Sequence, residues 1–127
     1  MPSSTDTTSR PPIVVLCGST RFWEQFAEAS LYETAAGRIV LAPGCNLREP
    51  HALWATPEQA DRIKHTLDNL HLRKIDLADD VLVINPGGYI GDSTRREIAY
   101  ARSLGKTIRY THSSEGGGSG LPSTPEA

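Results

Sequence analysis

The 127-residue sequence has few cysteines, few aromatic residues and no strong excess of either charge. Its two cysteines, Cys17 and Cys45, do not form a CxxC pair, which argues against a disulfide framework and for a reducing compartment such as the cytoplasm. The net charge of −2 argues against a broad basic face for polymeric nucleic acid. No apolar run approaches the roughly 20 residues that span a bilayer, and the first residues lack the apolar stretch of a secretory signal. These absences predict a small cytoplasmic domain with no membrane partner.

Common cofactor and nucleophile motifs are also missing. The run Gly105-Lys106-Thr107 resembles the end of a P-loop, but position 100 is Tyr100 rather than glycine, and the run follows a helical pattern. No GxGxxG opens a helix after the first apolar run, and there is no GxSxG elbow. The histidines lack metal-ligand spacing with one another or with the cysteines, so we predict neither a metal site nor a cofactor. These histidines are His51, His65, His71 and His112.

Both ends of the sequence differ in composition from the middle. Residues 1–11 are rich in serine, threonine and proline, and residues 112–127 are rich in glycine, serine and proline. Such segments cannot bury enough apolar surface to offset the entropy of ordering, so we expect both to be disordered tails. The folded domain is then residues 12–111.

The middle of the chain alternates between short apolar runs and helical patterns. The apolar runs predict buried strands over 13–17, 39–41, 81–84 and 107–110. Helical patterns lie between them, over 21–36, 56–77 and 94–104. This order predicts an α/β fold, a small doubly wound parallel sheet of four to five strands with helices on both faces. The simplest strand order, numbered along the chain, is 2-1-3-4, and ligands bind such sheets where the order reverses, between strands 1 and 3.

The second helix has a well-marked start and an apolar stripe. Thr56 suits the N-cap, Pro57 the first position and Gln59 the third, where its amide can complete a capping box. Ile63, Leu67 and Leu70 recur at helical spacing, and we expect them to form its buried stripe.

Two turns, over residues 18–21 and 85–93, reach the predicted crevice. The second turn contains three glycines, which allow close backbone approach, and it opens a helix whose N-terminus favours a phosphate or a polarised sugar oxygen. Each turn also has a plainer interpretation, an ordinary N-cap for the first and a surface turn for the second. The candidate substrate-binding residues are Gly18, Ser19, Thr20 and Arg21 in the first turn, and Asn85, Gly88, Tyr89, Gly91, Asp92, Ser93 and Thr94 in the second.

Three residues are candidates for catalysis. Glu97 lies one turn into the third helix, where its carboxylate can face a bound sugar; alternatively, it completes a capping box with Thr94. His71 and Asp76 lie near the end of the second helix and can act as acid or base, unless they only form a solvated helix end.

Aromatic recognition has its own candidates. Asn46, His51 and Trp54, in the long loop 42–55, are candidates for recognising an aromatic ring. For Trp23, we favour core packing over that role.

The segment 74–106 (KIDLADDVLVINPGGYIGDSTRREIAYARSLGK), with VVLCGSTRF at 14–22, resembles the nucleoside 2-deoxyribosyltransferase-like superfamily, which includes the 2'-deoxynucleoside 5'-phosphate N-hydrolases. The resemblance covers roughly residues 12–111 and implies a flavodoxin-like sheet, a small-molecule nucleoside or nucleotide as partner, and a homodimer or higher homo-oligomer. It implies that Glu97 is the nucleophile on the anomeric carbon and that Ser93 or Thr94 binds the 5' end. Leu72 stands where the N-hydrolases carry an aspartate acid, beside His71.

A second, looser resemblance supports the same bond chemistry. The run 86–97 (PGGYIGDSTRRE) is similar, with inserted residues, to the PGGxGTxxE signature of phosphoribohydrolases of the lysine-decarboxylase-like group. The sequence therefore predicts cleavage or transfer of an N-glycosidic bond on a nucleoside or its 5'-monophosphate. The alternatives are a non-catalytic nucleotide-binding or sensing module, and a partner-binding domain that exposes Arg95 and Arg96.

Overall fold

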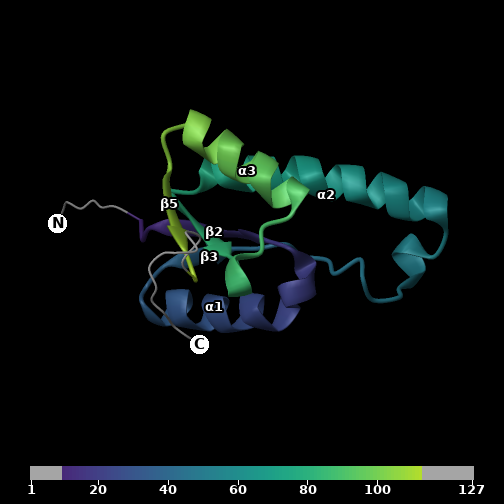
Figure 1. Ribbon diagram of the computed structural model, residues 1–127, viewed down its shortest axis with the longest axis horizontal. Coiled ribbons are helices and arrows are strands. Elements are labelled where there is room, and N and C mark those ends of the chain that lie inside the picture. Colours follow the sequence, from purple (N-terminus) through teal and green to yellow (C-terminus); the bar gives the residue numbers. More distant parts are fainter. Residues whose placement is uncertain (1–9, 113–127) are drawn as a thin grey trace.

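Four parallel strands form the centre of the computed structural model, which describes residues 10–112 (Figure 1). In space their order is β3-β2-β4-β5, which confirms the predicted strand order. The predicted tails 1–11 and 112–127 lie outside the described residues, except for residues 10, 11 and 112. The strands are β2 (Ile13–Gly18), β3 (Ile39–Leu41), β4 (Asp80–Ile84) and β5 (Thr107–Tyr110).

Three helices cover the two faces of this sheet. Figure 1 shows α1 on one face and both α2 and α3 on the other, so the fold has three layers. A short 3-10 turn lies in each of the three connections that lead from a strand to the next helix. The helices are α1 (Trp23–Ala35), α2 (Pro57–Leu77) and α3 (Asp92–Ser103), and the turns are η1 (Thr20–Phe22), η2 (Ala52–Trp54) and η3 (Pro86–Gly88). None of the helices within 10–112 combines the length and apolar character that a membrane crossing requires.

The sheet separates two hydrophobic clusters because side chains alternate along a strand. Val14 and Leu16 of β2 pack towards Phe26 and Ala29 of α1. On the other face lie residues of β2 and β4 with residues of α2, its C-cap and α3: Val15, Cys17, Ile75, Ala78, Val81, Val83, Ile98 and Ala101. Burial of β2 and β4 on both faces explains their continuous apolar runs.

Helix α2 confirms one prediction and corrects another. Thr56 and Gln59 form the predicted capping box, with Pro57 at the first position. The predicted buried stripe is wrong, because Leu70 is 46% exposed and the buried side chains of α2 are His71 and Ile75. Leu67 and Leu70 line an open cavity instead of the core, and Figure 1 shows the first half of α2, which carries Ile63, extending beyond the sheet.

The carboxyl end of β2 requires a glycine. Gly18 pairs with Ile84 of β4, and a Cβ atom on Gly18 would lie 2.7 Å from the Ile84 carbonyl oxygen. This close approach brings the ends of β2 and β4 together at the edge where the strand order reverses.

Candidate active site

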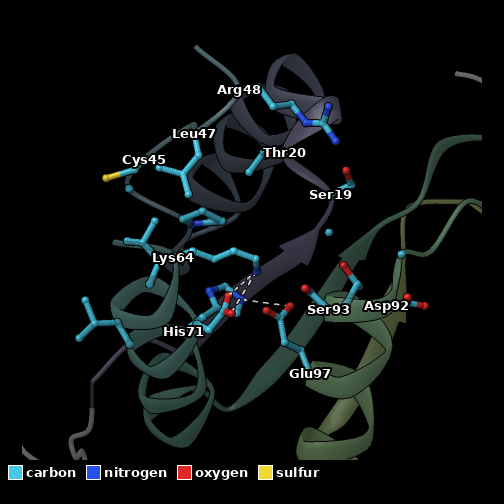
Figure 2. Close-up of a pocket in the computed structure, with 18 of the residues that line it drawn as sticks. Ser19, Thr20, Cys45, Leu47, Arg48, Lys64, His71, Asp92, Ser93 and Glu97 are labelled. Carbon is cyan, nitrogen blue, oxygen red and sulfur yellow. Dashed lines mark hydrogen bonds and ion pairs between the residues drawn. The ribbon is translucent and has the colours of Figure 1, made fainter. Parts of the chain in front are cut away.

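A cavity of about 460 Å³ opens at the carboxyl edge of the sheet, beside the ends of β2 and β4. Its wall is built from five segments: the turn after β2, the loop after β3, one face of α2, the loop after β4 and the first turns of α3 (Figure 2). Of the predicted residues, the cavity lining includes Gly18, Ser19, Thr20, His71, Tyr89, Gly91, Asp92, Ser93, Thr94 and Glu97. Residues far apart in the sequence therefore meet in the predicted crevice.

The glycine-rich turn aims the start of α3 at this cavity. Gly87 and Gly88 adopt positive φ values of 67° and 82°, a conformation that other residues rarely adopt. Gly91 is the N-cap, so α3 begins at Asp92, and the N–H groups of its first turn have no partner within the helix. Ser93 and Thr94 line the cavity beside them. This arrangement suits a phosphate or a sugar hydroxyl.

Glu97 points into the cavity, as Figure 2 shows. Its side chain is 16% exposed, and Oε1 lies 3.7 Å from Nε2 of His71. The capping-box alternative with Thr94 is wrong, because the N-cap is Gly91, and Glu97 lies more than one turn beyond it. The carboxyl group is therefore available to a ligand.

Cys17, His71 and Glu97 form one cluster at the base of the cavity, although they come from β2, α2 and α3. Cys17 Sγ lies 3.3 Å from Nε2 of His71, and the three polar atoms lie within 4.8 Å of one another. Burial raises the pKa of Glu97 to about 7, and the charge of Asp68 adds to this effect. Burial, followed by the charge of Lys74, lowers the pKa of His71 to about 4, so its imidazole is neutral at pH 7. Burial, followed by the charge of Glu97, raises the pKa of the Cys17 thiol.

One face of α2 supplies a wall of which the sequence predicted only His71. Asp68 forms an ion pair with Lys64, with 3.1 Å between Nζ and Oδ2, and Lys74 donates a hydrogen bond to the Ala42 carbonyl. The residues of this face recur every three or four positions along α2, a spacing that could have identified it from the sequence. Its lining residues are Lys64, Leu67, Asp68, Leu70, His71 and Lys74.

Four predicted residues lie outside the cavity lining, which corrects their expected placement. The Arg21 guanidinium lies over the Tyr89 ring, 4.1 Å from its centre. Asn85 is fully buried, and its side-chain oxygen accepts hydrogen bonds from Thr111 and His112, which fixes the end of β5. Asp76 accepts a hydrogen bond from the Tyr100 hydroxyl and pairs with Arg73, so its carboxylate is engaged on the outer surface. The fourth is Gly88, whose positive φ shapes the turn.

The residues predicted to recognise an aromatic ring stabilise their own loop instead. His51 Nδ1 accepts a hydrogen bond from the Leu53 amide, Asn46 accepts one from the Arg48 amide, and Trp54 donates one to the Glu49 carbonyl. The part of this loop that lines the cavity consists of Pro43, Gly44, Cys45, Leu47 and Arg48. Trp23, in the first turn of α1, is half-buried, and the centre of its ring lies 6.3 Å from that of Phe26. It is not among the residues that pack against either hydrophobic cluster, so the core packing that we favoured is not confirmed.

The fold has a counterpart among solved structures. It is similar to a 2-deoxyribosyltransferase from the psychrotolerant bacterium Bacillus psychrosaccharolyticus, described as a biocatalyst for the synthesis of antiviral and antitumoral nucleosides. The TM-score is 0.57 at 20% sequence identity, and the match covers 77% of this chain and 70% of that chain. No protein-family model and no curated protein matches the chain. The likeness confirms the predicted deoxyribosyltransferase-like, flavodoxin-like α/β fold.

Proposed function

We propose that this protein cleaves or transfers the N-glycosidic bond of a nucleoside or a nucleoside 5'-monophosphate, with Glu97 as the nucleophile. The observation that supports this most strongly is a desolvated carboxyl group at the base of a cavity, next to the hydroxyl-bearing first turn of α3. The shared fold with a nucleoside 2-deoxyribosyltransferase supports the same substrate class.

The chemistry requires a carboxylate in this position. Breaking the bond from the anomeric carbon to the base nitrogen builds positive charge on the sugar, which a nearby carboxylate stabilises. The Glu97 oxygen attacks that carbon, the base leaves with the bonding electron pair and takes up a proton, and a glycosyl ester remains. Water or a second base then attacks the same carbon and releases Glu97, which gives hydrolysis or transfer.

The cavity wall suggests how such a substrate is held. Ser93, Thr94 and the free N–H groups of α3 suit the 5' end of the sugar, and Ser19 and Thr20 lie across from them (Figure 2). The loop after β3 provides an apolar wall with the Arg48 guanidinium, which suits a base. His71 lies beside Glu97 and is engaged with Cys17, so we assign to it the positioning of the nucleophile.

Base release provides the test. Nucleosides and their 5'-monophosphates, incubated with the protein in EDTA, are followed by chromatography of the free base. We expect turnover of at least one compound, and a loss of about 10³-fold or more in Glu97→Gln, because removing a nucleophile removes the covalent route. The exposed Glu28 on α1 offers a matched control, and Glu28→Gln should retain full activity.

The covalent intermediate gives a second readout. A 2-deoxy-2-fluoro nucleoside slows release of the sugar, so mass spectrometry should find the added sugar on the peptide that contains Glu97. Full turnover by Glu97→Gln, or no turnover of any compound, would contradict the proposal; ligand-induced thermal stabilisation without product would favour the non-catalytic module instead. The homo-oligomer that the resemblance implies stays a prediction, which sedimentation velocity tests.

A further inference from the structure

Three different metal-ligand groups converge at the base of the cavity. Cys17 offers a sulfur atom, His71 a ring nitrogen and Glu97 a carboxylate oxygen, and these atoms lie within 4.8 Å of one another. We propose that the three side chains together bind a Zn²⁺ ion, with a fourth coordination position open to the cavity. The sequence predicts no metal site, because the separation of these residues along the chain matches no ligand motif. The fold nevertheless brings their ligand atoms together.

The distances suit such an ion. Bonds of about 2.0–2.3 Å from zinc to nitrogen, oxygen and sulfur place tetrahedral ligand atoms about 3.3–3.6 Å apart. The observed separations are 3.3 Å from Cys17 Sγ to His71 Nε2 and 3.7 Å from that nitrogen to Glu97 Oε1. The third pair, Cys17 Sγ and the Glu97 carboxylate, lies within 4.8 Å, so a shift of the Glu97 side chain towards the thiol completes the site.

The charges and ligand types also suit zinc. On binding, the thiol proton and any proton on Glu97 leave to solvent, and one thiolate with one carboxylate offsets the two charges of the ion. A sulfur and an imidazole nitrogen favour Zn²⁺ over Mg²⁺ or Ca²⁺, which prefer oxygen ligands. Two lysines also line the cavity, but Lys64 is paired with Asp68, and the ammonium group of Lys74 is bonded to the Ala42 carbonyl.

The ligands are held in place by the core. Cys17 belongs to the same hydrophobic cluster as Ile75, one turn after His71, and Ile98, which follows Glu97. Because β2, α2 and α3 pack together around this cluster, the core holds the three donors close to one another.

Zinc binding has a consequence that rests on the proposed function. A Glu97 carboxylate bound to Zn²⁺ cannot attack the anomeric carbon, so the ion and the sugar compete for the same group. We expect stoichiometric Zn²⁺ to inhibit base release and EDTA to restore it.

Cobalt provides a direct probe of the site. The full chain is titrated with Co²⁺, whose bond to a thiolate absorbs in the near ultraviolet, and Zn²⁺ is then added to displace it. We expect one equivalent to bind to the wild type, and Cys17→Ser and His71→Asn to weaken binding by roughly a hundredfold or more. His65→Asn is the matched control and should bind as the wild type does. Circular dichroism establishes that each variant is folded.

The outcomes separate this inference from the proposed function. No thiolate absorption in the folded wild type, or equal absorption in folded Cys17→Ser, overturns the zinc site even if base release proceeds in EDTA. Binding with the expected variant pattern supports the site even if no nucleoside is turned over. If zinc increases base release, the competition is overturned.

Discussion

At the scale of the single residue, Glu97 shows what burial does to a carboxyl group. Its side chain has little contact with water, and its pKa rises to about 7 because burial disfavours the charged form. The group is therefore close to half ionised at neutral pH, which links both the proposed reaction and the stability of the fold to pH.

The first prediction concerns the pH dependence of base release. Only the ionised carboxylate attacks the sugar, so kcat/KM in EDTA should rise about tenfold per pH unit up to a pH of about 7 and then level off. Initial rates between pH 5 and 9 measure this profile. A profile that is already level from pH 5.5 would show that Glu97 is not the ionising nucleophile.

The second prediction concerns stability. Between pH 4.5 and about 7 the folded state keeps the Glu97 proton that the unfolded state has lost, so wild-type stability falls as pH rises through this range. Glu97→Gln has no such proton and should be more stable than the wild type at pH 8, by on the order of 3 kcal/mol. The difference should shrink as the pH falls from about 7 to 4.5 and be lost below that.

Urea unfolding at pH 4, 6 and 8 in EDTA measures both proteins. Because the pKa of His71 is lowered to about 4, protonation of the unfolded state opposes stability as pH falls below 6.5, equally in both proteins. The comparison of the two therefore isolates Glu97, and an unchanged difference across this range would contradict its raised pKa.

At the scale of the element, local signals identified most strands and helices. The continuous apolar run of β4 and the capping box of α2 were readable because each depends on neighbouring residues. The exposure of Leu70 was not, because the apolar spacing of a helix does not reveal how far the sheet beneath it extends. The start of α3 at Asp92 depended on the backbone of Gly91 rather than on a side-chain cap.

The third prediction concerns the end of β2. Gly18→Ala places a Cβ atom 2.7 Å from the Ile84 carbonyl oxygen, so β2 and β4 must separate locally. We expect a loss of about 1–3 kcal/mol of unfolding free energy in urea denaturation. In the control, Gly44→Ala, the added Cβ meets no atom within 4 Å, and stability should change little. Equal effects of the two substitutions would contradict the close packing at Gly18.

At the scale of the whole molecule, long-range pairs fix the layers against one another. Arg109 of β5 pairs with Glu33 of α1 at 2.7 Å and with Asp80 of β4 at 2.9 Å. These pairs, like the Cys17, His71 and Glu97 cluster, join residues that no local spacing connects. The sequence could therefore indicate Glu97 and the glycine-rich turn individually, but not the partners that surround them.

The fourth prediction tests the contribution of Arg109. Because Glu33 is largely buried, Arg109→Gln leaves its carboxylate without its closest partner, and we expect a loss of about 1–3 kcal/mol in urea denaturation. The matched control is the exposed Arg95, and Arg95→Gln should change stability by less than about 0.5 kcal/mol. A loss of equal size in both variants would show that the bridge is not a specific support.

The parallel sheet also determines how the molecule can be handled. Arg10 pairs with Asp79 just before β4, whereas His112 bonds to Asn85 just after β4, so the described segment enters and leaves at opposite edges of the sheet. The cavity opens at the edge where it leaves. A dye, an affinity handle or a sensor chip attached at position 10 would therefore sit at the edge of the sheet opposite the cavity and leave the cavity facing the bulk solution.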